Sequence, residues 1–231
     1  MCMKIHISVK TFERKEMLIN TINEIQDFIK NNKNHNITFS ITDDKSPTYD
    51  ENFIKYYNIK QTEINYGKEK HWMLWDLDLK RIKTLGNFDL IIFIPDDLSN
   101  FNFNKIIDFG KKYINDYYVF NILNDGRDFC WNKIPPKKID NYHSSIGFCD
   151  CIFFTNSKTI DKIGYYIERI DPIRFKNNNI ISSGVGYQLT NRLNTKGVKI
   201  FKPASSLAYH GDHDSVMNYE IRKTQKLISK Y

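Results

Sequence analysis

Short apolar runs alternate with amphipathic stretches along the first half of the chain. Apolar residues recur at helical spacing in three stretches, 13–32, 71–86 and 103–115. The runs between them predict strands at 4–12, 36–41, 62–67, 89–94 and 117–123. This alternation is typical of a parallel sheet whose strands are joined by right-handed helical crossovers.

The second half of the chain has a less regular pattern. We expect a loop at 124–145, a strand at 146–155, helices at 157–170 and 184–197, short strands at 198–203 and 205–210, and a basic terminal helix from 215. No internal repeat and no long linker divides the chain. The pattern therefore predicts a single α/β domain over 1–231, with a mostly parallel central sheet flanked by helices.

Composition supports a packed core and indicates an anionic partner. The 231 residues are 41% hydrophobic and 14% aromatic, which argues against disorder. The 34 Lys and Arg exceed the 27 Asp and Glu, for a net charge of +7. A basic balance favours a nucleotide, a nucleic acid or an acidic membrane as partner, without choosing among them.

Targeting signals and metal-binding cysteines are not evident. The sequence has no 18-residue apolar span and no signal-peptide pattern at "MCMKIHISVK", so we expect a soluble, cytoplasmic protein without a transmembrane segment. The four cysteines, Cys2, Cys130, Cys149 and Cys151, lack the paired spacing of a zinc site. They are interpreted as free thiols in a reducing compartment.

The segment "LIIFIPDDLSN", 90–100, ends an apolar run with adjacent carboxylates. The run predicts a strand buried on both faces, and Pro95 should end it because proline cannot donate to a sheet ladder. Asp96 and Asp97 then repel each other unless a cation or water lies between them. A ligand site and a solvated turn are both compatible with this segment.

Polar groups follow several predicted strands, at Thr11–Arg14, Asp43–Asp44, Asp96–Asp97 and His210. Each alone has an ordinary structural explanation. The carboxyl ends of parallel strands share one edge of a sheet, however, and ligands of open α/β sheets bind there. Carboxylates with an imidazole suit Mn²⁺ or Mg²⁺ bridging a diphosphate.

The order "SVKTFER", "ITDDKSP", "FIPDDLSN" and "YHGDHDSVMN" resembles the nucleotide-sugar glycosyltransferases of GT-A fold, including small enzymes of phages and viruses. The resemblance covers roughly residues 4–215. It implies transfer of a sugar from a nucleotide-diphosphate sugar, with a UDP-sugar as first candidate, to a hydroxyl acceptor. It also implies a nucleotide-binding half at 1–123, an acceptor and metal half at 124–213, and a basic helix at 214–231.

The resemblance also implies roles for individual residues. Asp97 and His210 would hold Mn²⁺ or Mg²⁺. The donor would be bound by Thr11, Phe12, Arg14, Asp43, Lys70, His71 and Asp96.

Two departures from the family pattern affect the expected chemistry. Pro95 stands where many members have the first acidic residue of the metal motif. Val185 and Gly186 stand where inverting members have the carboxylate that deprotonates the acceptor. Asp150 is then the candidate general base. A retaining enzyme needs no such base, so the stereochemistry stays open.

The acceptor is sought in the loop at 124–145, where basic and aromatic side chains alternate. Arg127, Trp131, Lys137 and Lys138 could hold a phosphate backbone and stack a base. With the net charge of +7, this loop favours DNA as acceptor. The resemblance of "HGDHDSVMN" and the basic helix after it to glycosyltransferases of phages and viruses implies 5-hydroxymethylpyrimidine as the acceptor base. A cytoplasmic glycan or glycolipid glycosyltransferase, a metal-dependent nucleotidyltransferase-like enzyme and a nucleic-acid-binding module are the alternatives.

Overall fold

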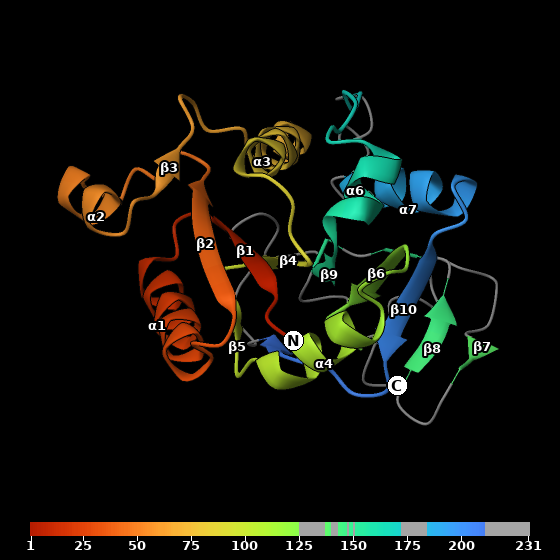
Figure 1. Cartoon of the computed structure of the whole chain (residues 1–231). Coiled ribbons are helices and arrows are strands. Elements are labelled where there is room, and N and C mark those ends of the chain that lie inside the picture. Colours follow the sequence, from red (N-terminus) through yellow and green to blue (C-terminus); the bar gives the residue numbers. More distant parts are fainter. Residues whose placement is uncertain (125–136, 140–142, 147, 150, 172–183, 211–231) are drawn as a thin grey trace, which may run out of the picture.

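The computed structural model describes residues 1–124, 137–139, 143–146, 148–149, 151–171 and 184–210. Most of the strands lie in one nine-stranded sheet with the order β3-β2-β1-β4-β9-β6-β10-β8-β7 (Figure 1). Its strands are β1 Lys4–Thr11, β2 Asn36–Asp43, β3 Lys60–Gln61, β4 Leu90–Pro95, β6 Tyr118–Asn121, β7 Lys137–Lys138, β8 His143–Ile146, β9 Phe153–Thr155 and β10 Lys199–Pro203. A separate two-stranded sheet pairs β5 Leu98–Ser99 with β11 Tyr209–His210.

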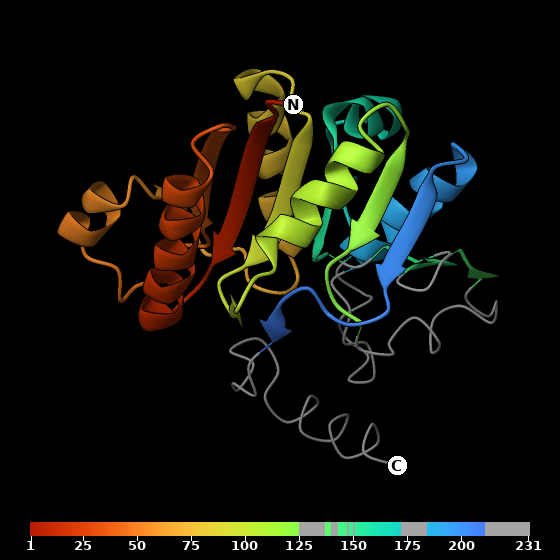
Figure 2. The same ribbon diagram turned by 60° about the horizontal axis from the view of Figure 1, so that its bottom comes forward.

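Helices cover both faces of the large sheet (Figures 1 and 2). Those described are α1 Lys15–Asn31, α2 Glu51–Tyr56, α3 His71–Leu85, α4 Phe103–Lys112, α6 Ser157–Ile163 and α7 Val185–Thr195. The first hydrophobic cluster joins the sheet to α1 and α4, and the second joins it to α3, α6 and α7. A sheet covered on both faces needs strands that are apolar on both faces, as β4 is.

Seven of the nine described strands of the large sheet run in the same direction. The exceptions are β8 and β9, which pair antiparallel with both of their neighbours. The predicted single α/β domain with a mostly parallel sheet is therefore confirmed. Strand β9 comes late in the chain but lies between β4 and β6, so it joins the two parallel parts of the sheet.

Several predicted elements differ from the structure. Residues 62–67 do not form a strand, because the Asp44 carboxylate accepts the backbone N–H groups of Tyr66 and Gly67 and holds this segment as a loop. The predicted strand at 146–155 is instead the end of β8 and the whole of β9. The helix predicted at 157–170 ends at Ile163, since Gly164 follows with φ +90°. The predicted terminal helix lies outside the described residues.

Strand β1 has one apolar face and one polar face, although both are buried. Ile5, Ile7 and Val9 belong to the first hydrophobic cluster. On the opposite face the Lys10 ammonium lies 2.8 Å from the Asp78 carboxylate of α3 and 3.7 Å from the centre of the Trp75 ring. The pair is almost fully buried, and removing the Asp78 charge would leave the Lys10 ammonium without its ion-pair partner.

His6 lies on the same polar face of β1 and is kept neutral. Its two ring nitrogens each lie 3.0 Å from a hydroxyl of β2, those of Thr38 and Ser40. Burial lowers the pKa of His6 to about 4, although the nearby Asp78 charge opposes the shift. Burial also lowers the pKa of His71 to about 4. Between about pH 4 and the ordinary histidine pKa of about 6.5, both imidazoles are therefore protonated in the unfolded chain and neutral in the folded chain.

This protonation difference predicts a pH-dependent stability. Below about pH 6.5 the unfolded chain binds a proton at His6 that the folded chain rejects, so the free energy of unfolding falls as the pH falls towards 4. His6→Gln should remove up to about 1.4 kcal/mol per pH unit of this slope. Urea unfolding of both proteins between about pH 7.5 and pH 5 measures it. Equal slopes would contradict the assignment of a neutral buried His6.

Within the described residues, no helix combines the length and the apolar character needed to cross a membrane.

Candidate functional site

The register of three strands brings the predicted donor residues to one edge of the sheet. Thr11 at the end of β1 pairs with Asp43 of β2, and Lys10 pairs with Pro95 of β4. Asp96, the next residue, therefore lies beside Thr11. The structure gathers these carboxyl-terminal strand ends as the sequence pattern predicted.

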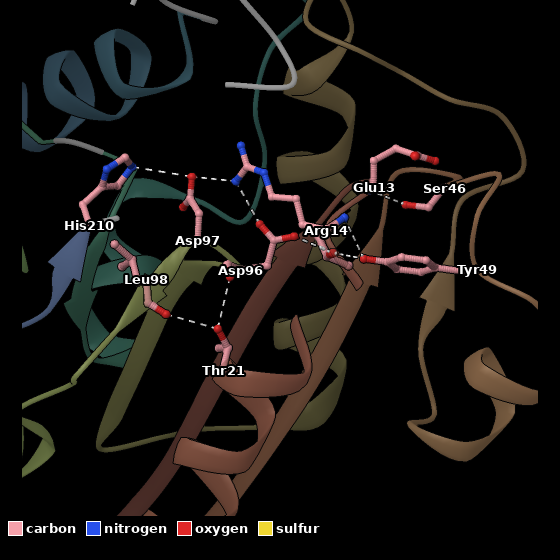
Figure 3. Close-up of polar contacts among 10 residues, drawn as sticks. Glu13, Arg14, Thr21, Ser46, Tyr49, Asp96, Asp97, Leu98 and His210 are labelled. Carbon is pink, nitrogen blue, oxygen red and sulfur yellow. Dashed lines mark hydrogen bonds and ion pairs between the residues drawn. The ribbon is translucent and has the colours of Figure 1, made fainter. Parts of the chain in front are cut away.

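His210 reaches this edge by another route than the predicted one. It lies in β11, which is not part of the large sheet but pairs antiparallel with β5, so that His210 is opposite Leu98. The imidazole Nε2 lies 3.5 Å from Oδ2 of Asp97, the residue before Leu98 (Figure 3). Strand β5 was not predicted, because two residues are too short to show a period.

Arg14 lies between the two adjacent carboxylates. Its Nη1 is 2.6 Å from Asp97 Oδ2 and 3.2 Å from Asp96 Oδ1 (Figure 3). The other Asp96 oxygen, Oδ2, accepts the Thr11 hydroxyl at 2.7 Å, and the Phe12 backbone N–H also donates to this carboxylate. Thr11, Phe12 and Arg14, all predicted as donor-binding residues, thus surround Asp96.

The two carboxylates have opposite pKa shifts. Burial raises the pKa of Asp96 to about 7, with the Asp97 charge adding to the rise and Arg14 and Thr11 opposing it. Burial would also raise the pKa of Asp97, but the His210 contact and the Arg14 charge outweigh burial and hold this pKa well below its usual range. Asp97 is therefore the carboxylate that stays ionised, which suits a metal ligand.

Asp97 also has an oxygen that fits a metal ion. Its Oδ1 is buried and has no hydrogen-bond partner within the described part of the chain. A hard divalent cation prefers carboxylate oxygens and accepts imidazole nitrogen, so Asp97 and His210 fit Mn²⁺ or Mg²⁺. The described residues contain no group of three or more potential ligands, so the ion would need other oxygens to complete its shell.

Side chains that the sequence did not indicate anchor two segments of the site. These segments are the loop with Arg14 and the turn with the two carboxylates. The Glu13 backbone has φ +61°, and its N–H donates to the Ser46 hydroxyl at 2.8 Å. The Tyr49 hydroxyl contacts both the Thr11 hydroxyl at 2.7 Å and the Arg14 N–H at 3.3 Å. The buried Thr21 hydroxyl of α1 lies 3.2 Å from the carbonyl oxygens of Asp96 and Leu98 (Figure 3).

Asp43 has a local structural role in addition to the predicted donor role. Its carboxylate accepts the Ser46 hydroxyl at 2.5 Å, the Ser46 backbone N–H at 2.9 Å and the Gln61 side-chain amide at 2.9 Å. The side chain is fully buried. These bonds hold the turn after β2 and leave this carboxylate little capacity to accept a further donor.

Lys70 and His71 begin α3, where the sequence placed them. Lys70 is exposed at the N-cap position. The His71 Nε2 accepts the Trp75 indole N–H at 3.2 Å, which turns this imidazole towards its own helix. His71 thus contacts Trp75, and the Trp75 ring in turn contacts the buried Lys10 ammonium.

The predicted acceptor residues are described only in part. Arg127 and Trp131 lie outside the described residues. Lys137 and Lys138 are exposed on β7, the edge strand, five strands away from β4. At about 4.8 Å per strand this separation is roughly 24 Å, so only an extended acceptor could contact both these lysines and the carboxylates.

The structure also bears on the general base. Asp150 lies outside the described residues. At Gly186 a Cβ atom would lie 2.9 Å from the Cys149 carbonyl oxygen, which is too close for a side chain. Val185, its neighbour in α7, is fully buried. Gly186 therefore has no room for a side chain, and the first turn of α7 has no acidic residue.

The chain is similar in fold to solved GT-A glycosyltransferases. The mannosyltransferase PcManGT from Pyrobaculum calidifontis, in complex with GDP-Man and Mn²⁺, matches 99% of this chain and 63% of its own, with a TM-score of 0.58 and 9% identity. TarS 1–349 from S. aureus with UDP-GlcNAc matches 93% and 60%, with a TM-score of 0.56 and 14% identity. GalNAc-T7 with UDP, GalNAc and Mn²⁺ matches 87% and 42%, with a TM-score of 0.54 and 9% identity.

The chain covers less than two thirds of the length of each of these structures. No protein-family model and no curated protein matches its sequence. Identities this low show the fold and nothing finer. The chain has the fold of the GT-A glycosyltransferases.

Proposed function

We propose that the chain is a glycosyltransferase that uses a nucleotide-diphosphate sugar and a divalent cation. The observation that carries this proposal is the buried, unpartnered Oδ1 of Asp97 beside His210, at the carboxyl end of β4 in a GT-A fold. The ligands of similar structures support it, since PcManGT binds GDP-Man with Mn²⁺ and TarS binds UDP-GlcNAc. A UDP-sugar is the first candidate donor.

The residues around the carboxylates would have separate tasks. Asp97 and His210 would hold Mn²⁺ or Mg²⁺, which when bound supplies positive charge to the departing diphosphate. Thr11 and Phe12 hold Asp96 by hydrogen bonds, and this carboxylate would face the donor ribose. Arg14 would pair with the diphosphate. Lys70 and His71 would line the nucleoside side of the donor site, and Asp43 would contribute there through the turn after β2 that its carboxylate holds.

Asp150 is the proposed proton acceptor for an inverting reaction. The supporting observation is that Gly186 leaves no room for a side chain at the position where many inverting glycosyltransferases have this carboxylate. The Asp150 carboxylate would take the proton from the acceptor hydroxyl as the new glycosidic bond forms. A retaining reaction would not need Asp150 in this role.

A nucleotide-sugar screen with an Asp97 variant tests the donor proposal. Thermal shift and donor hydrolysis with UDP-, GDP-, CDP- and dTDP-sugars, with and without Mn²⁺, should give a metal-dependent response to one nucleotide. Asp97→Asn should keep the fold and lose at least about 100-fold in turnover, because the amide binds a cation poorly. Asp108→Asn, at an exposed position of α4, is the matched control. Full activity of Asp97→Asn would rule out the metal role.

For the acceptor, we propose 5-hydroxymethylpyrimidine in DNA. The net charge of +7 and the exposed pair Lys137 and Lys138 support an anionic, extended acceptor. Arg127 and Trp131 are proposed as further acceptor-binding residues. A neutral glycan has no negative charge to pair with these basic residues. Transfer to a glycan instead of DNA is the competing outcome.

Sugar transfer to DNA tests this acceptor directly. A duplex containing 5-hydroxymethylcytosine should gain one sugar by mass spectrometry, whereas an unmodified duplex should not. Replacing both Lys137 and Lys138 by Gln should lower the salt slope of DNA binding by about 2, because two phosphate contacts are lost. The control replaces Lys30 and Lys33, exposed near the end of α1. Transfer to glycans alone would refute the DNA acceptor, and equal slopes for both double variants would refute the phosphate contacts of Lys137 and Lys138.

A further inference from the structure

The Arg14 guanidinium occupies the position where the two carboxylates most need a positive charge. It lies within 3.2 Å of both Asp96 and Asp97, and the three side chains are between 3% and 12% exposed. Two adjacent buried carboxylates repel each other strongly unless a cation compensates them. Arg14 is therefore an internal counter-ion for the same carboxylate groups that a divalent cation would approach.

The backbone at Arg14 is held independently of its guanidinium. The Arg14 N–H donates to Tyr49, its carbonyl oxygen accepts the Leu18 N–H at 2.9 Å, and the preceding Glu13 N–H donates to Ser46. None of these bonds involves the side chain of Arg14. The guanidinium can therefore leave the carboxylates while the loop and the start of α1 stay in place.

A divalent cation at Asp97 would be in conflict with this arrangement. The buried Oδ1 is available, but Arg14 is bound to Oδ2 of the same carboxylate. An ion held by Oδ1 would therefore share one carboxylate group with the guanidinium. The repulsion between them is weakly screened at a site this buried. Tight binding of the ion therefore requires Arg14 to move away.

We propose that Arg14 competes with the divalent cation for Asp97 and, once displaced, pairs with the donor diphosphate. The proposal rests on the proposed donor site and adds a coupling within it. A guanidinium released from two carboxylates is well suited to a diphosphate, since its planar fork binds phosphate oxygens in pairs. Cation and diphosphate then strengthen each other's binding through one side chain.

The test is a pair of binding measurements on Arg14→Gln, which removes the charge and keeps an N–H donor. Binding of Mn²⁺ alone, followed by electron paramagnetic resonance of the free ion, should be about 10-fold tighter than in the wild type. Binding of pyrophosphate in excess Mn²⁺, measured by calorimetry, should be about 10-fold weaker. A variant that is merely misfolded would weaken both, so opposite directions identify the competition.

Two control variants separate the local effect from general charge. Arg14→Lys keeps the positive charge and should bind Mn²⁺ about as the wild type does. Lys15→Gln removes the same charge from the neighbouring residue, whose partner is the exposed Asp50, and should change neither affinity. Thermal unfolding checks each fold, and Arg14→Met gives the same test if the glutamine variant does not fold. Arg14→Gln binding Mn²⁺ no tighter than the wild type, or pyrophosphate no more weakly, would overturn the proposal.

The result is distinguishable from a failure of the proposed function. If no nucleotide sugar is hydrolysed but Arg14→Gln shows both shifts, the competition stands and the glycosyltransferase activity does not. If a nucleotide sugar is hydrolysed and Arg14→Gln shows neither shift, the activity stands and the competition is wrong.

Discussion

The burial of two adjacent carboxylates at the end of β4 is the constraint on which the site depends. Asp96 and Asp97 can share this position only because positive charge and hydrogen-bond donors converge on them from other elements. Arg14 comes from the loop after β1, and His210 comes from the far end of the described chain. The Thr21 hydroxyl holds the turn itself, through the carbonyl groups of Asp96 and Leu98.

On the opposite face of β1, buried charges are also compensated by side chains from another element. Lys10 there is compensated by Asp78, and Arg81 adds a second contact to Asp78 at 2.8 Å. This buried pair links the strand to α3, while Thr11 links the next position to Asp96. Neighbouring residues of one strand thus serve two polar networks on opposite sides of the sheet, so a shift in register would disrupt both.

The parts of the fold that were predicted correctly are those with a local period. The strands β1, β2 and β4 and the helices α1, α3 and α4 follow from apolar spacing alone. The position of β9 in the sheet does not follow from apolar spacing, because packing between distant segments determines which strands pair. The same holds for β5 and β11, whose pairing brings His210 to Asp97.

For the site, the sequence indicated the residue types at the strand ends but not their partners. Five of the predicted residues lie together: Thr11, Arg14, Asp96, Asp97 and His210. The hydrogen bonds of Asp43 with Ser46 and Gln61 could not be predicted from the sequence. One available signal was overlooked. "KIHISVK" alternates polar and apolar residues, and Asp78 lies on the apolar face of its helix, so a buried polar contact between β1 and α3 was predictable.

The position of β9 has a consequence for folding during synthesis. Until Thr155 has emerged, β4 has no partner on one side, and its apolar run Leu90–Ile94 forms an open sheet edge. At the usual rates of synthesis the stretch from Pro95 to Thr155 takes roughly 3 to 12 s. Exposed apolar edges are templates for pairing with other chains. The nascent chain is therefore open to such pairing in this interval, which ends when β9 inserts between β4 and β6.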